Sequence, residues 1–278
     1  MDVSQRRSLE RTALEVRKDV VRMIGVARSG YLGSSLSAVD ILVFMYRRLL
    51  NVLPEDPRMH DRDRMVLGKG HACPALYAVL AERGFFDRKE LWNFRRLGSM
   101  LQGHPEMLRT PGIDAPGGSL GMGLGLSNGI ALALRLDGVG SRVFCLLGED
   151  ELQEGSVWES AMQTSCLGLG NVTAVVDMNG KVASARKIQP VMDKFGSFGW
   201  RTVHADGHDM EDLERAFSFA ASDPVPCVIL AETLSGKGFS MAEKDLIGAS
   251  MPLDREMMEQ ALRELESGTK SLDREEEL

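Results

Sequence analysis

The pattern of apolar and polar positions predicts helices that alternate with short apolar strands. Helical spacing indicates helices at residues 10–28, 37–50 (capped by a serine run at 34–37), 74–84, 122–136, 155–167 and 209–221. Runs rich in β-branched residues indicate strands at 64–67, 143–147, 172–177 and 225–231, with 202–204 as a weaker one. Because strands separated by helices require right-handed crossovers, we expect an α/β fold, a parallel β-sheet with helices on both faces.

Composition and charge narrow the possible partners. The 278 residues include 33 Lys and Arg against 40 Asp and Glu, without a basic run, which argues against nucleic acid and anionic membranes. The longest uncharged stretch, 115–134, contains six glycines, so we expect no membrane span. The charged N-terminus lacks a secretory signal, and the four cysteines form no CxxC pair. We therefore expect a cytoplasmic protein without zinc or disulfides.

The chain is expected to form one domain over residues 1–278, because no internal repeat or long linker divides it. Its last part, 253–278, is amphipathic and strongly charged. The simplest interpretation of this segment is a solvated surface helix that ends in a frayed acidic terminus.

Glycine is over-represented, with 29 residues, and five glycines cluster between positions 117 and 125. Their spacing does not match the GxGxxG pattern of dinucleotide-binding loops, and the run at 235–238 does not match a P-loop. The cluster therefore indicates tight turns or a backbone that lies close to a ligand.

Two polar residues follow neighbouring strands of the predicted sheet. Glu149 comes directly after the strand 143–147, and Asn179, 30 residues later, ends the next one. The carboxyl ends of parallel strands open into one crevice, which is where ligands bind in such sheets. Carboxylate and amide oxygens are hard ligands of the kind that Mg²⁺ or Ca²⁺ takes beside phosphate oxygens. Two solvated loop ends would explain the same residues.

Here the sequence resembles the thiamine-diphosphate-binding N-terminal domain of the transketolase family. The family's metal motif begins Gly-Asp-Gly and ends about 30 residues later in Asn, and this chain has GEDELQEGSVWESAMQTSCLGLGNVTAVVDMNG at 148–180. Further segments match in order over about residues 10–250: SGYLGSSLSAVDILVFMY (29–46), LGKGHACPALYAVLAERG (67–84), QGHPE (102–106), TPGIDAPGGSLGMGLGLSNGIALAL (110–134), KFGSFGW (194–200), DGHD (206–209) and SGKGFS (235–240). The joint specificity of these segments is high.

The resemblance implies a cofactor and its ligands. Thiamine diphosphate would bind together with a divalent metal, Mg²⁺ or in its place Ca²⁺ or Mn²⁺. Glu149, Asn179 and the carbonyl of Lys181 would hold this metal, with Gly148 and Asp150 beside them.

The resemblance also implies a wall and four catalytic side chains. The wall around the cofactor's rings would consist of Gly118, Leu120 and Gly121. Among the catalytic residues, His71 would contact the diphosphate, and His104 would face the hydroxyl groups of the substrate. The other two, Glu154 and Glu159, match carboxylates that the family places at the subunit interface, near the glutamate that activates the cofactor.

Five positions depart from the family pattern. Glu149 replaces the metal-binding Asp, and Asp150 replaces the second Gly of that motif. Tyr31 and Ile247 stand where the family has histidines, and Met122 stands where Gln or His is common. These changes make the crevice less polar. We therefore hypothesise that the substrates are not the usual sugar phosphate pair and include a smaller or more apolar 2-keto compound or aldehyde.

In the family, the activating glutamate lies on a pyrimidine-binding domain, for which this chain has no sequence. We therefore expect a split enzyme, in which a C-terminal transketolase-like subunit supplies that domain and glutamate in an α₂β₂ assembly. The reaction would transfer a ketol or acyl unit from a ketose or 2-keto acid donor to an aldehyde acceptor. Two alternatives remain at this stage, namely the α subunit of a 2-oxo-acid dehydrogenase and a catalytically degenerate subunit that only binds a partner.

Overall fold

The computed structural model describes residues 1–180, 188–248 and 250–276, the last four of these by their backbone only. Within this part of the chain, five strands form one sheet in the order β1-β2-β3-β5-β4, and all neighbours are parallel. The strands are β1 Arg64–Leu67, β2 Val143–Gly148, β3 Val172–Met178, β4 Arg201–Asp206 and β5 Cys227–Glu232. The prediction of a parallel α/β sheet is thus confirmed, and the weak strand at 202–204 is a full edge strand.

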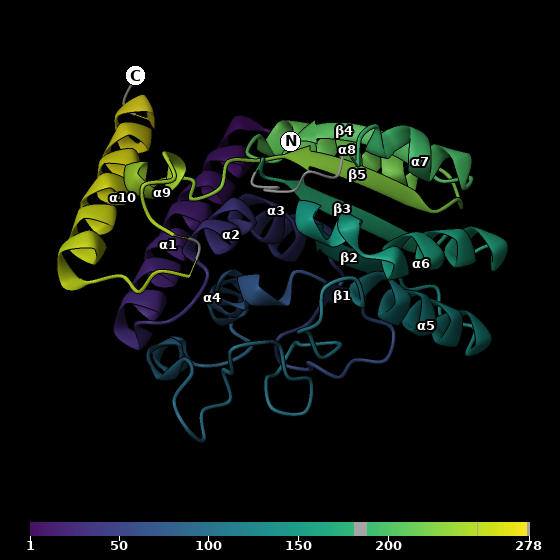
Figure 1. The fold of residues 1–278 in the computed structure, drawn as a ribbon, viewed down its shortest axis with the longest axis horizontal. Helices are drawn as coiled ribbons and strands as arrows, with labels where there is room; N and C mark the ends of the chain where they lie inside the picture. Colours follow the sequence, from purple (N-terminus) through teal and green to yellow (C-terminus); the bar gives the residue numbers. More distant parts are fainter. Residues whose placement is uncertain (181–187, 249, 277–278) are drawn as a thin grey trace.

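Helices cover both faces of the sheet, as predicted (Figure 1). Alternate side chains of each strand point to opposite faces, so that β2 contributes Phe144 and Leu146 to one core and Cys145 and Leu147 to the other. The first core is completed by α1 Val3–Ala27, α3 Val39–Phe44, α4 Cys73–Arg83 and α8 Met210–Ala221. The second is completed by α5 Gly123–Leu136, α6 Gly155–Cys166 and α7 Val191–Ser197.

The first two helices differ from their prediction. Helix α1 begins at Val3 rather than near residue 10, because Asp2 and Gln5 form a capping box at its start. The serine run does not cap the second helix. It lies inside the short helix α2 Leu32–Ser37, where the Ser35 hydroxyl donates to the carbonyl of Tyr31 at 2.7 Å. Helix α3 follows, and a π-helical turn at Met45–Leu49 ends the segment.

The C-terminal segment forms the amphipathic surface helix that was predicted, and its apolar side is packed. Helix α10, Arg255–Glu276, lies along α1 (Figure 1). Its Ala261 and Leu265 are buried in the first core. Glu264 accepts hydrogen bonds from the backbone N–H and the hydroxyl of Ser240, the first residue of α9 Ser240–Glu243, at 2.7 and 2.8 Å. The tail is therefore part of the packed fold.

In the described part of the chain, none of the helices has the length and apolar character needed to cross a membrane.

Candidate active site at the carboxyl edge of the sheet

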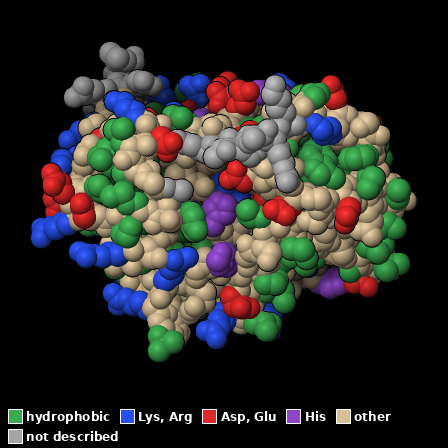
Figure 2. Space-filling model, in the orientation of Figure 1, with side chains coloured by type: hydrophobic (Ala, Val, Ile, Leu, Met, Phe, Trp, Pro, Cys, Tyr) green, Lys and Arg blue, Asp and Glu red, His purple; other side chains and the backbone are tan. Residues whose placement is uncertain are grey.

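The polar residues singled out in the sequence lie where parallel strands end together. Gly148, Asp177 and Ala231 are paired across β2, β3 and β5, so the loops that follow these strands start at the same level. Figure 2 shows histidine side chains in the middle of this face, with acidic side chains beside them. The loops after β1, β2, β3 and β5 therefore begin at one edge of the sheet, where the crevice was predicted.

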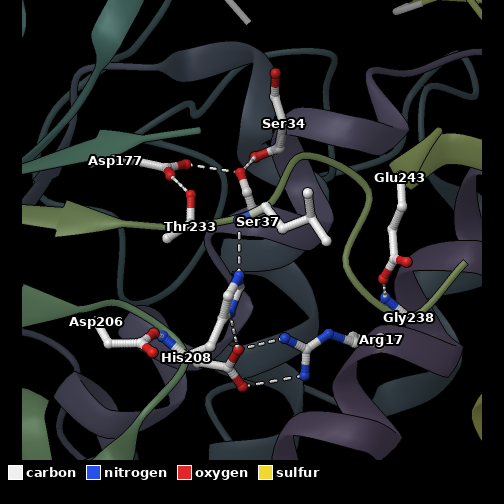
Figure 3. A network of polar contacts seen from close by, with 11 residues as sticks. Arg17, Ser34, Ser37, Asp177, Asp206, His208, Thr233, Gly238 and Glu243 are labelled. Atoms are coloured by element: carbon white, nitrogen blue, oxygen red, sulfur yellow. Dashed lines mark hydrogen bonds and ion pairs between the residues drawn. The ribbon is translucent and has the colours of Figure 1, made fainter. Parts of the chain in front are cut away.

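A buried ion pair joins three of these loops. Asp177, at the end of β3, is fully buried and pairs with Lys69, which follows β1 and is 1% exposed. The other donors to the same carboxylate are the hydroxyls of Ser37, at 2.7 Å, and Thr233, in the loop after β5 (Figure 3). A charge removed from water is stable only when it is paired and hydrogen-bonded in this way.

A second network holds the loop after β5 from the other side (Figure 3). The backbone N–H of Leu234 donates to Nε2 of His208 at 2.8 Å, so that His208 carries its proton on Nδ1 and donates it to Asp40 at 2.6 Å. Burial raises the pKa of Asp40, but the Arg17 guanidinium and His208 bring it down to about 2. The DGHD segment forms the turn expected of it, since Asp209 caps α8.

The predicted metal ligands lie together at the ends of β2 and β3. Glu149 is half-buried, and its Oε2 accepts a hydrogen bond from the N–H of Gly180 at 3.0 Å, directly after the half-buried Asn179. Burial, together with the negative charges of Asp150 and Asp177, raises the pKa of Glu149. Asp150 itself is exposed. The third predicted ligand, Lys181, lies outside the described residues.

The available donors fit a metal that is completed by its cofactor. The described residues contain no group of three or more His, Cys, Asp or Glu placed to hold a metal ion. One carboxylate and one amide from Glu149 and Asn179 leave coordination positions for phosphate oxygens, which is the usual way in which Mg²⁺ is bound. Glycines in the surrounding loops let two backbone segments approach each other closely beside these residues.

Two glycine contacts show how closely the loops at this edge of the sheet approach one another. A Cβ atom on Gly70 would lie 2.8 Å from the backbone nitrogen of Gly118, so the glycine run lies directly against the turn that carries His71. Gly121 has a φ of +84°, and a Cβ there would lie 2.6 Å from the Cβ of Glu154. Gly118 is exposed and Leu120 is half-buried, so both are accessible to a ligand.

A buried glutamate that the sequence analysis missed holds these loops together. Glu151 accepts hydrogen bonds from the N–H groups of Gly121 and Gly148, both at 2.9 Å. A side chain on Gly68 would meet the same carboxylate at 2.9 to 3.0 Å. Burial raises the pKa of Glu151. Its bond to Gly148 is a local capping interaction three residues away, whereas its bond to Gly121 joins it to a segment 30 residues earlier, which no local pattern indicates.

The two candidate histidines have different surroundings. His71 is half-buried, and the edge of its ring contacts Tyr31, with 5.1 Å between the ring centres. Burial, with the positive charges of Lys69 and His104, lowers the pKa of His71 to about 4. His71 is therefore neutral near pH 7. His104, in contrast, is exposed and lines a cavity of about 400 Å³ together with Glu106 and Gly117.

The cavity at His104 has a basic neighbour that the sequence analysis also missed. The guanidinium of Arg95 lies against Gly103, where an added Cβ would be 2.8 Å from its Nε, and its charge lowers the pKa of His104 after the larger effect of burial. Arg95 has a φ of +60° and its guanidinium donates to the hydroxyl of Ser29. Its position on an irregular loop left no periodic pattern to reveal it.

The remaining predicted positions lie at the margins of the crevice. Glu154 and Glu159 are both exposed, and Glu159 lines a shallow cavity with Gly121 and Met122. Met122 is 52% exposed, whereas Ile247 is buried in the first core. The position where the family has a second histidine thus carries a core side chain here.

The parallel sheet, with polar residues gathered at its carboxyl edge, is typical of an α/β cofactor-binding domain. Comparison with known proteins identifies the family to which this domain belongs. The family model described as "Transketolase, thiamine diphosphate binding domain" matches residues 9–266. The chain therefore belongs to the transketolase family, as its motifs predicted, and this family uses thiamine diphosphate. The alternative of a 2-oxo-acid dehydrogenase subunit is not favoured.

The relatives differ in how much of their length the chain spans. It is 37% identical to the 6-deoxy-6-sulfo-D-fructose transketolase subunit SqwG of Clostridium sp. (strain MSTE9), and the match covers 94% of this chain and 98% of that protein. It is 32% identical to an apulose-4-phosphate transketolase subunit from Phocaeicola vulgatus, with 96% and 97% covered. Human transketolase is 37% identical, but the 97% of this chain that is matched corresponds to 44% of that protein.

A solved structure agrees with this assignment. The crystal structure of transketolase from Campylobacter jejuni superposes on the chain with a TM-score of 0.85 and 30% identity, and covers 95% of this chain and 43% of that one. The chain thus spans less than half of the human and Campylobacter transketolases and nearly all of the two named subunits.

The buried ion pair predicts a specific pattern of stability. Lys69→Met and Asp177→Asn each leave one charge buried without its partner, so each should lower the free energy of unfolding by about 3–5 kcal/mol. The double variant buries neither charge and should lose clearly less than the sum of the two, as measured by urea unfolding. Lys89→Met, at an exposed ion pair with Asp87, is the control and should leave the midpoint unchanged. Additive losses would contradict the pairing.

The lowered pKa of His71 predicts that the stability of the fold depends on pH. Its pKa of about 4 in the folded protein lies below the ordinary 6.5, so the unfolded chain binds more protons between these values and stability falls as the pH drops from 6.5 to 4. At pH 4 this loss is about 3 kcal/mol. His71→Asn should remove this part of the acid sensitivity in unfolding curves recorded between pH 7 and 4. His60→Asn, on an exposed loop, should retain it, and equal curves for both variants would refute the assignment.

Proposed function

We propose that this chain is the cofactor-binding subunit of a split transketolase, which transfers a ketol unit from a ketose or 2-keto donor to an aldehyde acceptor. The observation that carries the proposal is the pairing of Glu149 with the backbone of Gly180, directly after Asn179, at the carboxyl edge of the sheet. The near-complete coverage of two split-transketolase subunits supports the same interpretation.

In this proposal the residues of the chain bind and orient the reactants. Glu149 and Asn179 hold the divalent metal, and the backbone at Gly118 and Gly121 lies along the cofactor. When bound, thiamine diphosphate supplies an electron sink for cleavage of a C–C bond next to a carbonyl. Because His71 is neutral, one ring nitrogen donates a hydrogen bond and the other accepts one. His104 faces the substrate, with Arg95 beside it.

A partner subunit completes the site. We infer that it carries the pyrimidine-binding domain and the glutamate that activates the cofactor, and that the two proteins form an α₂β₂ assembly. Glu154 and Glu159 are exposed and lie next to the glycine run, which supports their place at the contact with this partner. Glu159 shares its shallow cavity with Met122, so the surface offered there is partly apolar.

Cofactor titration tests the proposal directly. In the complex of this chain with its partner, Glu149→Ala and Asn179→Ala should each weaken Mg²⁺-dependent binding of thiamine diphosphate at least about tenfold. Glu149→Asp keeps the carboxylate and should bind the cofactor. Glu266→Ala, an exposed carboxylate on α10, is the matched control. Calorimetry measures all four. Cofactor binding without turnover would favour the degenerate subunit, and Mg²⁺-independent binding would refute the metal site.

The environment of His71 suggests what the substrates are. The ring of Tyr31 packs against that of His71, and Ile247 is buried in the core, so neither position offers the imidazole that the family has there. We infer that this subunit favours a smaller or more apolar 2-keto compound or aldehyde over the usual sugar phosphate pair.

A substitution at Tyr31 tests this specificity. With xylulose 5-phosphate and ribose 5-phosphate, the assembled enzyme should turn over poorly, and Tyr31→His should raise its kcat/KM about tenfold by restoring a hydrogen-bonding ring. Tyr31→Phe removes only the hydroxyl and should not. Steady-state kinetics of the three enzymes decide the question. Fast turnover of this pair by the parent enzyme would show that Tyr31 does not narrow the substrate range.

A further inference from the structure

A cavity of about 510 Å³ lies at the opposite end of β1 from the cofactor site. Arg64, the first residue of β1, lines it together with Arg58, Arg62 and Arg109. The described lining contains one carboxylate, that of Asp114, against these four guanidinium groups. In an acidic protein with a net charge of −7, this concentration of positive charge is unusual.

The inner arginines are anchored by Asp114. Arg62 is 8% exposed, and its guanidinium pairs with Asp114, which also accepts a hydrogen bond from the N–H of Met65 at 2.8 Å. Arg64 is farther from the same carboxylate, at 3.7 Å, and donates to the carbonyl of His60 at 2.9 Å. Burial and the charge of Arg62 lower the pKa of Arg64, whereas the carboxylates of Asp114, Asp63 and Asp61 act in the opposite direction.

Structural roles do not account for the rest of this charge. The Nε atom of Arg62 is buried and has no hydrogen-bond partner among the described residues. Arg58 and Arg109 are exposed at the rim, and no side-chain hydrogen bond or ion pair to a described residue is found for either. Asp114, Asp63 and Asp61 act on the inner arginines, so the charge left for a ligand is that of Arg58 and Arg109. Guanidinium groups bind phosphate through paired N–H donors.

We propose that this cavity binds a phosphorylated metabolite, whose phosphate group lies between Arg58 and Arg109 above the buried Arg62. The apolar side chains of Met107 and Leu108 border the same space and would cover the carbon skeleton of the ligand. Both are strongly exposed in the chain alone, Leu108 to 82%. The site is separate from the diphosphate crevice, which lies at the carboxyl ends of the strands.

The position of the cavity suggests what its ligand does. Arg109 also lines the cavity that holds His104, so the segment 106–110 forms a wall shared by the two spaces. Hydrogen bonds tie this segment to itself and to the preceding loop. The backbone N–H groups of Arg109 and Thr110 donate to the carbonyl of Glu106 at 3.2 and 3.1 Å, and the hydroxyl of Thr110 donates to the carbonyl of Met100 at 2.7 Å. A ligand that orders the arginine side of this wall therefore also orders the side that faces His104.

Glycerol 2-phosphate is a suitable probe, because it is a phosphomonoester that has no carbonyl group and cannot act as donor or acceptor. Calorimetric titration of the full chain, with and without thiamine diphosphate and Mg²⁺, should give saturable binding of similar affinity in both. Arg58→Gln/Arg109→Gln should weaken this binding at least about tenfold, because two charges of the site are removed. Arg255→Gln/Arg263→Gln, two exposed arginines of α10, should change it less than about twofold.

Three outcomes would overturn the proposal. Equal affinity for the parent and the Arg58→Gln/Arg109→Gln variant would show that these side chains do not bind the phosphate. Loss of binding when thiamine diphosphate and Mg²⁺ are added would show that the probe occupies the cofactor crevice. Absence of saturable binding in either state would show that the cavity holds no phosphate. None of these results depends on whether the chain is a transketolase subunit, since the assay measures no turnover.

Discussion

The crevice depends on one buried carboxylate. Asp177 ends the central strand β3 without exposure to solvent, and burying an unpaired carboxylate would cost several kcal/mol. The cost is offset only when Lys69, Ser37 and Thr233 all donate to it. These donors come from three different elements, so the loops after β1 and β5 and helix α2 are fixed around β3. Their positions in turn place His71, Tyr31 and the loop that His208 holds.

Local patterns predicted much of the fold and only part of the site. The strands β2, β3 and β5 were found because buried parallel strands are continuous apolar runs. Glu149 and Asn179 could be proposed as metal ligands because they follow such runs directly. Glu151 and Arg95 were missed, since each is defined by groups distant in sequence, such as Gly121 and Ser29. The serine run was misplaced for the same reason, because its hydroxyls bond to earlier carbonyls and to Asp177.

The departures from the family pattern have a common physical direction. The ring of Tyr31 packs against that of His71, and Ile247 lies in the core, so two imidazoles of the family pattern are replaced, one by a phenol and one by an apolar side chain. Such a change is expected to weaken the binding of substrates that rely on hydroxyl contacts far more than that of substrates that do not. The reason is that a buried polar group left without a hydrogen-bond partner costs free energy. Glu149 changes less, since its longer side chain still reaches the backbone of Gly180. Specificity and cofactor binding can therefore vary independently.

The charged side chains at the two ends of the sheet have opposite signs, so we expect the two ends to bind anions in different ways. Around the proposed cofactor site lie Glu149, Asp150 and Asp177, and among the described residues Lys69 pairs with Asp177. A diphosphate would therefore bind there together with a divalent cation. At the far end of β1, the arginine cavity carries positive charge in its own side chains and needs no metal. On the two proposals made above, a free phosphomonoester would be repelled at the first site and attracted at the second, whereas a metal-bound diphosphate would bind at the first. This division of charge would let one domain hold two anionic ligands without competition between them.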